Sequence, residues 1–189
     1  MVNETLTITK EKISSPSVGT VMHEWEHPIM KAKADFVCQK GGDIIEFGFG
    51  LGISATYIQK HNINSHTICE INPQILNKLH VWAKNKSNVT ILEGDWFDNI
   101  NKMGKYDGVL FDTHMDNHAS YFPKLLLNIC KPKCLVTWWN NLPTEYNEFK
   151  IKDTKFTILN VNPPKNTYFN YKHYYMPKYI YNHGYMARS

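Results

Sequence analysis

The feature that most constrains this chain of 189 residues is an apolar run that ends in closely spaced glycines, "IIEFGFGLGIS" (44–54). A continuous apolar run of this length is typical of a buried parallel strand. Glycines directly after such a strand allow a sharp turn and let a ligand lie against bare backbone. The segment therefore predicts a strand–turn–helix unit with a binding site at the turn.

The same theme returns along the chain and predicts the fold class. Helix-like stretches alternate with apolar runs, which indicates a parallel, doubly wound sheet. The expected strands are 41–50, 66–71, 89–94, 106–113 and 134–139, and the expected helices are 26–40, 52–60, 73–86, a short piece near 96–103, and 118–131. Two further runs, 155–161 and 167–176, are joined by a Pro-Pro turn without a helix and predict an antiparallel hairpin at the sheet edge. The expectation is an α/β, Rossmann-like fold with a mostly parallel seven-stranded sheet and an antiparallel C-terminal hairpin.

Size and composition narrow the protein class. A length of 189 residues suits one domain, 1–189, in which 1–20 form an N-terminal extension that is either flexible or lid-forming. No apolar run approaches the length of a membrane span, and the first twenty residues lack the apolar core of a secretory signal. Four cysteines without CxxC spacing indicate reduced thiols in a cytoplasmic protein. A net charge of +4 is too mild to predict nucleic-acid binding.

The spacing of the glycines selects among nucleotide-binding loops. The loop reads Glu46-x-Gly48-x-Gly50-x-Gly52, and these four residues with Ile53 are its expected ligand-binding positions. A dinucleotide fingerprint requires Gly or Ala where Ile53 stands, and a phosphate-binding P-loop requires a lysine that is absent here. An acid two residues before G-x-G-x-G is similar to motif I of class I S-adenosylmethionine-dependent methyltransferases.

Acidic residues after the next two strands fit an adenosyl ligand. Glu70 ends the second strand, where a carboxylate can accept hydrogen bonds from both ribose hydroxyls. In "EGDW" (93–96), after the third strand, Gly94 precedes Asp95, which is placed to take the adenine amino group, and Trp96, which is placed to cover the ring. Each also has a structural interpretation, Glu70 as a solvated strand end and Asp95 as a helix N-cap. Together with the glycine loop they predict S-adenosylmethionine as the cofactor, with S-adenosylhomocysteine as the product.

Asp112 and one of the two acids Glu24 and Glu26 are candidates for binding an acceptor. Asp112 lies at the end of the fourth strand, in "GVLFDTH", at the edge where doubly wound folds bind ligands. The alternative is a loop carboxylate that caps the next turn. Glu24 and Glu26 flank Trp25 in "HEWEHPIM" (23–30), where acids also suit the first turn of a helix.

With these residues the sequence resembles a known family. The block "VMHEWEHPIM" followed by "GGDIIEFGFG" is similar to the V-M-x-x-W-E-x-P-x-M and G-G-x-(V/I)-(L/I)-E-(V/F)-G-F-G pattern of guanidinoacetate N-methyltransferases and related arginine-modifying methyltransferases. "ICEIN", "YDGVLFDT" and, loosely, "VNPPKNTYFNYKHYYMP" continue the likeness. It covers residues 20 to 139 well and the closing hairpin loosely.

The resemblance implies a role for each matching residue. Glu26 and Asp112 correspond to the acids that hold the acceptor and act in catalysis. Met22 and Met30 flank the cofactor, Phe49 and Gly50 belong to its loop, and Glu70 holds its ribose. Glu24 falls on a position that the family does not use and is expected to be solvated, while Trp25 is either a wall of the acceptor site or a core residue. Asn140, Asn141 and Leu142 are placed to contact an acceptor carboxylate.

The implied function is S-adenosylmethionine-dependent N-methylation of a guanidino group on a small molecule, of guanidinoacetate or arginine type. The chain departs from the family where Gly-Gly before strand five is replaced by "KPKC" (131–134), and where the segment after strand five leaves room for one short helix. A more open site is compatible with arginine, another guanidino compound or an arginine in a protein. The oligomeric state is not indicated.

Other functions remain as alternatives. One is methylation of another amine or of nucleic acid; the chain has an "NPPK" (162–165), but it follows strand six and ends in lysine, which favours a hairpin turn. Another is a non-catalytic cofactor-binding module, which would not need Glu26 or Asp112. His114 and His118 have the spacing of a metal pair, but we expect exposed loop histidines and no metal.

Overall fold

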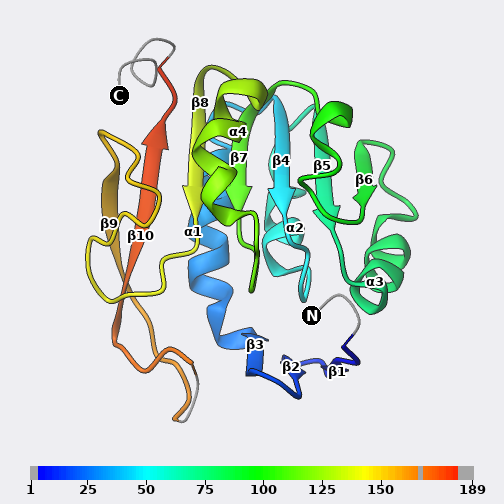
Figure 1. Ribbon diagram of the computed structural model, residues 1–189, viewed down its shortest axis with the longest axis vertical. Coiled ribbons are helices and arrows are strands. Elements are labelled where there is room, and N and C mark those ends of the chain that lie inside the picture. Colours follow the sequence, from blue (N-terminus) through cyan, green and yellow to red (C-terminus); the bar gives the residue numbers. More distant parts are fainter. Residues whose placement is uncertain (1–3, 166–167, 183–189) are drawn as a thin grey trace.

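The structure is a computed structural model that describes residues 4–165 and 168–182 (Figure 1). Its main element is a seven-stranded sheet with the order β6-β5-β4-β7-β8-β10-β9. Five neighbouring strands are parallel, and β10 runs antiparallel to both β8 and β9. The bounds are β4 Asp43–Phe47, β5 Ser65–Glu70, β6 Val89–Glu93, β7 Tyr106–Phe111, β8 Cys130–Trp138, β9 Lys155–Asn160 and β10 His173–Ile180. The expected α/β fold class is confirmed.

Helices cover both faces of the sheet because successive strand residues point to opposite sides. On one face, α1 packs against Ile44, Leu110 and Leu135. On the other face, α4 packs against the adjacent residues Ile45, Val109 and Val136. The helices are α1 His27–Val37, α2 Ile53–Ile58, α3 Pro73–Ala83 and α4 Phe122–Ile129, with short 3-10 turns η1 Glu24–Glu26, η2 Ile100–Lys102 and η3 Ala119–Tyr121. The strands, and with them the loops that follow, are thereby fixed to a two-sided core.

The N-terminal extension forms a small antiparallel sheet of its own, with the strands β1 Thr7–Ile8, β2 Lys12–Ser15 and β3 Gly19–His23. It lies at the end of the large sheet toward which the parallel strands point (Figure 1). The backbone N–H of Leu6 donates to Gln74 of α3 at 2.7 Å, and Ile13 is fully buried. The extension therefore packs over the edge where a ligand site was predicted.

Several expected elements differ in extent. The strand expected at 167–176 begins only at His173, and Thr167 lies outside the described residues. The antiparallel pair of β9 and β10 does lie at the sheet edge, with β9 outermost and β10 paired with β8. The helix expected over 118–131 ends at Ile129 because β8 begins at Cys130, and the piece near 96–103 shortens to the single turn η2.

The two departures from the family pattern have local consequences. Where the family has Gly-Gly, Lys133 adopts a φ of 63° and its backbone N–H donates to Tyr181 at 2.9 Å, so a lysine takes the left-handed conformation that glycine favours. Between Trp138 and Lys155 the chain is irregular, and the room for one short helix is taken by turns and bends. No helix among the described residues is long and apolar enough to cross a membrane. All four cysteines are buried and unpaired.

Candidate active site

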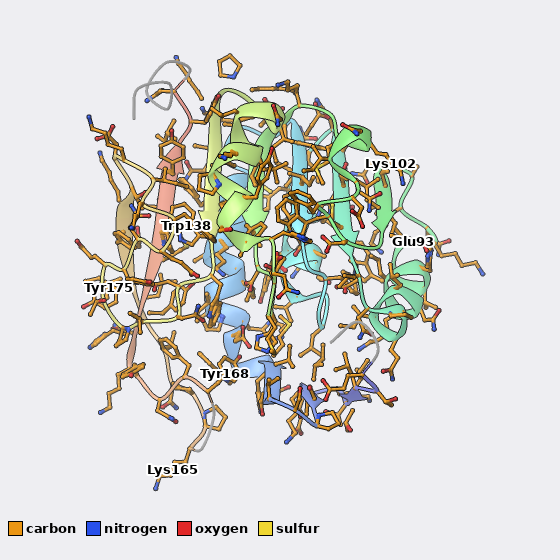
Figure 2. All side chains as sticks on the ribbon, in the orientation of Figure 1. Glu93, Lys102, Trp138, Lys165, Tyr168 and Tyr175 are labelled. Carbon is orange, nitrogen blue, oxygen red and sulfur yellow. The ribbon has the colours of Figure 1, made fainter. Side chains whose placement is uncertain are left out.

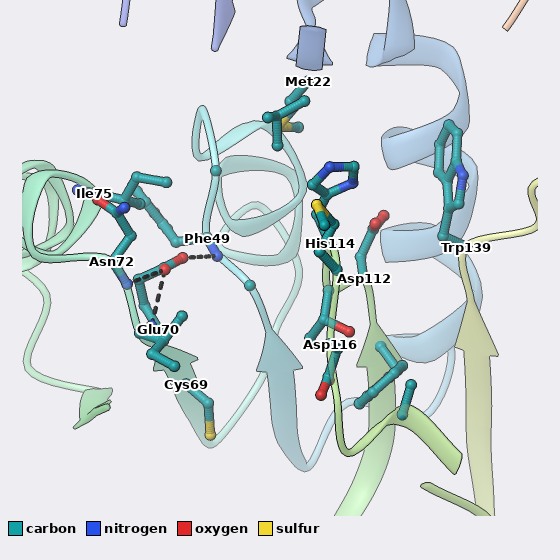
Figure 3. Close-up of a pocket in the computed structure, with 18 of the residues that line it drawn as sticks. Met22, Phe49, Cys69, Glu70, Asn72, Ile75, Asp112, His114, Asp116 and Trp139 are labelled. Carbon is teal, nitrogen blue, oxygen red and sulfur yellow. Dashed lines mark hydrogen bonds between the residues drawn. The ribbon is translucent and has the colours of Figure 1, made fainter. Parts of the chain in front are cut away.

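A cavity of about 670 Å³ opens at the carboxyl ends of the parallel strands. Its volume lies within the range of small-molecule sites. Figure 3 shows Glu70, Phe49 and Asn72 on one side and Asp112, His114 and Trp139 on the other, with Met22 above them. Of the predicted site residues, the cavity is lined by Met22, Glu26, Met30, Gly48, Phe49, Gly50, Glu70, Gly94, Asp95, Trp96, Asp112 and Asn141.

The glycine loop forms the floor of the cavity between β4 and α2. Gly48 has a φ of 85°, and a Cβ there would lie 2.3 Å from the carbonyl oxygen of Asp112. Gly50 has a φ of 54°, and a Cβ there would lie 2.4 Å from the Sδ of Met22. A side chain at either position would therefore be strained and would collide with a neighbour. At these two positions the loop thus presents backbone, not side chains, to the cavity.

Three predicted cofactor residues lie behind this loop instead of lining the cavity. Glu46 is fully buried, accepts a hydrogen bond from the Ser54 hydroxyl and contacts His66 Nε2 at 3.0 Å. Gly52 has a φ of 77° and packs beneath the Phe49 ring, and Ile53 begins α2. They fix the shape of the loop and do not reach the cavity themselves.

Glu70, at the end of β5, binds the glycine loop to the next connection. Its Oε2 accepts the Phe49 N–H at 2.9 Å, and its Oε1 accepts the N–H groups of Ile71 and Asn72 at 2.9 and 2.8 Å. The side chain is buried, which raises its pKa despite these donors. It is therefore a held carboxylate at the cavity wall, not the solvated strand end that was the alternative.

The connection after β6 forms a second wall on the Glu70 side of the cavity. Asp95 accepts the Phe97 N–H at 2.9 Å through Oδ1 and contacts His118 Nδ1 at 3.0 Å through Oδ2. Trp96 is buried in the core, and its Nε1 donates to Asp116 at 2.6 Å. Asp95 therefore closes a local turn on the cavity wall, and the helix N-cap position that was its alternative belongs to Asn99, before η2. Trp96 lines the cavity with a largely buried ring.

These residues fit an adenosyl ligand. Bare backbone lies at Gly48 and Gly50, where a Cβ would clash with Asp112 or Met22, a buried carboxylate stands at Glu70, and an aspartate stands at Asp95. S-adenosylmethionine needs a close backbone approach, a carboxylate for the ribose hydroxyls and an acceptor for the adenine amino group. Those three needs are met at the ends of three neighbouring strands.

On the opposite side, Glu26 comes from η1, just before α1. Its carboxylate is 3% exposed. Its Oε1 accepts the backbone N–H of His23 at 2.7 Å and a hydrogen bond from the Tyr168 hydroxyl. Burial, with the charge of Asp112, raises its pKa to about 7, against the opposing effect of the two donors and of Lys33. Figure 2 places Tyr168 beside the amino-terminal end of α1.

Asp112 follows β7 and lines the cavity with Glu26. Its Oδ2 accepts a hydrogen bond from the Lys33 ammonium at 2.8 Å. The Asp112 side chain keeps 22% of its surface exposed, whereas that of Lys33 keeps 0%. The two candidate acids therefore line a common cavity. Glu26 also has the helix-start role, since its carboxylate caps η1 through the His23 N–H, but its side chain is buried and does not face solvent. Glu24 is exposed, as expected.

Lys33 and Tyr168 were not identified from the sequence. Lys33 stands on the buried face of α1, with Ile29, Met30 and Val37. Its spacing from these apolar residues matches the helical repeat, and that spacing was a signal that Lys33 faces inward. Tyr168 gave no such signal, since 142 positions separate it from Glu26. Both lie beside the acids that the resemblance selected.

Three of the four predicted acceptor residues lie away from the cavity. Trp25 stacks on Phe169 at a centroid distance of 5.8 Å, which favours its core interpretation. Asn140 is buried, and its amide donates to the carbonyls of Thr144 and Tyr175 at 2.9 Å. Leu142 is 42% exposed, so only Asn141 lines the cavity, where its Oδ1 accepts from Trp139 Nε1 at 2.9 Å.

Metal ligands are not gathered at this site. No group of three or more His, Cys, Asp or Glu side chains within residues 4–165 and 168–182 is arranged to hold an ion. His118 contacts Asp95 and stacks on Phe97 at 4.3 Å, while burial lowers the pKa of His114. Both histidines belong to the connection after β7.

Comparison with known proteins agrees with this geometry. A precorrin-6y C5,15-methyltransferase from Geobacter metallireducens superposes with a TM-score of 0.61 at 14% identity, covering 84% of this chain and 89% of that one. A spermidine synthase from Thermotoga maritima gives 0.65 at 10% identity, over 93% and 72%. At these identities the two likenesses show the fold, a Rossmann-like fold that this chain shares with methyltransferases such as the first.

The sequence comparisons identify the family. Residues 17–131 match the profile of guanidinoacetate N-methyltransferase, and the chain belongs to that family. Two relatives named protein arginine N-methyltransferase 2 are similar: one from Candida glabrata at 30% identity over 84% of this chain and 46% of its own length, and one from Saccharomyces cerevisiae at 28% over 88% and 48%. The chain spans about half the length of these relatives.

Proposed function

We propose that this chain is an S-adenosylmethionine-dependent N-methyltransferase that methylates a guanidino nitrogen. The observation that carries the proposal is the position of Glu26 and Asp112, which come from distant segments and line the cavity that also contains the glycine loop. A non-catalytic binding module would need the loop and Glu70 but neither of these acids.

The acid pair suits the chemistry of a guanidinium. This cation stays charged at neutral pH and its nitrogens are weak nucleophiles, because their lone pairs are delocalised. In the described part of the chain, the hydrogen bonds to Glu26 end on Oε1 and the one to Asp112 ends on Oδ2. Glu26 Oε2 and Asp112 Oδ1 are therefore left for the acceptor. Two charge-assisted hydrogen bonds, one to each acid, would fix the plane of the guanidinium.

S-adenosylmethionine supplies a methyl group already activated on a sulfonium when it is bound. The chain's contribution is to aim one acceptor nitrogen along the line of the carbon–sulfur bond and to remove a proton. The acidity of that nitrogen rises as its lone pair forms the new bond to carbon, and Asp112 accepts the proton at Oδ1. Proton acceptance contributes about 10²–10⁴ in rate, and alignment a comparable or larger factor.

A second candidate is an acceptor whose guanidino group has no carboxylate beside it, such as an arginine within a polypeptide. The described residues that line the cavity include six acids and no Lys or Arg: Glu26, Glu70, Asp95, Asp112, Asp116 and Glu148. The backbone N–H of Leu142 is already bonded to Asn140 Oδ1 at 3.0 Å, and that of Asn140 to the Tyr174 hydroxyl at 2.9 Å. An acceptor carboxylate would find few free donors. The relatives named protein arginine N-methyltransferase 2 favour the same acceptor.

The test is incubation with methyl-labelled S-adenosylmethionine and a panel of guanidino compounds, amines, arginine peptides and RNA. Guanidinoacetate and arginine are each paired with their amides, which keep the guanidino group and lose the carboxylate. Label on guanidino acceptors supports the proposal, and preference for the amides and peptides supports the second candidate. Label confined to RNA or to non-guanidino amines would refute both.

A further inference from the structure

Lys33 is a buried cation at the acceptor side of the cavity. It stands on α1 with 0% of its side chain exposed, and its Nζ lies 2.8 Å from Asp112 Oδ2. The ammonium also lies over the Trp139 ring, 4.7 Å from its centroid, and 5.7 Å from that of Tyr174. A lysine is almost never fully buried unless it is paired, so this position is built around the ion pair.

Fold stability does not account for this pair. A well-packed apolar pair often replaces a buried ion pair at little or no loss in the free energy of unfolding. The other inward residues near it on α1, Ile29, Met30 and Ala34, are apolar. The described structure holds Lys33 against the acid that lines the cavity, where its charge acts on the acceptor site.

We propose that Lys33 is a positioning residue of the acceptor site, which holds Asp112 by one oxygen and leaves the other to the acceptor. The inference rests on the proposed function and deepens it. When both acids are ionised, they and Lys33 together carry a net charge of −1, where the acids alone would carry −2, so that one guanidinium neutralises the site. An unpaired second carboxylate would instead promote protonation of one of the acids.

The groups that face Glu26 set how this charge acts. They are Asp112 after β7, Lys33 on α1, Tyr168 after β9, Tyr174 on β10 and the backbone N–H of His23. Among them Lys33 is the cation, and it favours the ionised form of Glu26, whereas burial and Asp112 favour the protonated form. Loss of the Lys33 charge therefore raises the pKa of Glu26 and reduces the ionised acid pair at neutral pH.

The experiment compares Lys33→Gln, which keeps a hydrogen-bond donor and loses the charge, with Lys33→Arg, which keeps the charge. Lys31→Gln is the matched control, because Lys31 is an exposed lysine on the same helix, paired with Asp35 at 2.5 Å. The readouts are the ¹³C carboxyl titration of Glu26 by NMR and, for any guanidino acceptor found, kcat/KM against pH. The titration needs no acceptor, so it decides the inference even if methyl transfer to guanidino groups is not found.

We expect the Glu26 midpoint of Lys33→Gln to move up by roughly one pH unit, with the acid limb of kcat/KM moving in the same direction. Lys33→Arg should stay near the original midpoint, and Lys31→Gln should change neither readout. If the Glu26 midpoint in Lys33→Gln matches that of Lys31→Gln, the inference is wrong. Absence of label on every guanidino acceptor, together with the expected shift in midpoint, would instead refute the proposed function alone.

Discussion

The two halves of the cavity are built in different ways. The half beside Glu70 is made of consecutive strand ends, and its carboxylate is held by backbone N–H groups of neighbouring turns. The half beside Asp112 is made of side chains that meet across the fold, with Lys33 and Tyr168 lying 79 and 142 positions from their partners. The first half depends on local backbone geometry, and the second on long-range pairing of charged and polar groups. Mutations should therefore separate cofactor binding from acceptor chemistry.

The largest expected effect comes from removing either acid of the second half. Asp112→Asn and Glu26→Gln should each lower kcat/KM for the acceptor by about 10²–10⁴ or more, because the guanidinium loses a charge-assisted hydrogen bond and Asp112 also accepts the proton. Cofactor affinity, measured by calorimetry with S-adenosylhomocysteine, should change little. Near-normal turnover in both variants would show that the acid pair does not orient the acceptor.

The opposite pattern is expected for the glycine loop. Gly48→Ala places a Cβ at a φ of 85° and 2.3 Å from a backbone carbonyl, so we expect cofactor Kd to rise about tenfold or more and stability to fall by roughly 2–4 kcal/mol. Gly104→Ala is the control, since no atom lies within 4 Å of its Cβ. If the two variants had the same stability in thermal unfolding and the same cofactor Kd in calorimetry, Gly48 would not be needed to bring bare backbone to the cofactor.

The buried charge of Glu26 gives a pH-dependent stability effect. Its pKa is raised from 4.5 to about 7 in the folded chain, so folding favours the protonated form. The stability from this group is fully present below pH 4.5 and is lost as the pH rises through about 7. Glu26→Gln should therefore be more stable than the parent by roughly 2–3 kcal/mol at pH 8, with little difference at pH 4. Urea unfolding of the parent and of Glu26→Gln at pH 4 and pH 8 measures this difference in stability. A difference of the same size at both pH values would contradict the raised pKa of Glu26.

The smallest effect is expected for Tyr168→Phe, which removes one donor to Glu26. The pKa of Glu26 should rise further, and kcat/KM at pH 7 should fall roughly three- to tenfold, with partial recovery at higher pH. Tyr171→Phe, an exposed tyrosine of the same connection, is the control. If Tyr168→Phe lowered the cofactor affinity and left the pH profile of kcat/KM unchanged, Tyr168 would belong to the cofactor half of the cavity, and its assignment to the acceptor half would be wrong.

The same contrast explains which parts of the molecule were predictable. The glycine loop, Glu70 and the mostly parallel sheet with its antiparallel C-terminal pair follow from apolar runs and turn residues a few positions apart, and the structure has them as expected. Glu26 and Asp112 were found by the resemblance to a family, since nothing in their own segments pairs them. The helical phase of Lys33 marks it as facing inward, but no sequence pattern pairs Lys33 with Asp112 or Tyr168 with Glu26, because the partners lie far apart along the chain.

The segment after β8 shows a second limit. Asn140 was expected at the acceptor, but its side chain is used to hold the irregular chain that follows, through the carbonyl of Thr144 and the N–H of Leu142. An asparagine at a strand end is equally suited to binding a ligand and to closing a turn. Only the positions of the neighbouring backbone groups decide between these roles.

The most direct test of the acid pair is a crystal structure of the chain with S-adenosylhomocysteine and methylguanidine or an arginine peptide. We expect the guanidinium between Glu26 Oε2 and Asp112 Oδ1, with Lys33 still bonded to Asp112 Oδ2 and one guanidino nitrogen facing the cofactor sulfur. A guanidinium bound elsewhere in the cavity, or either acid turned out of it, would show that the acid pair does not hold the acceptor.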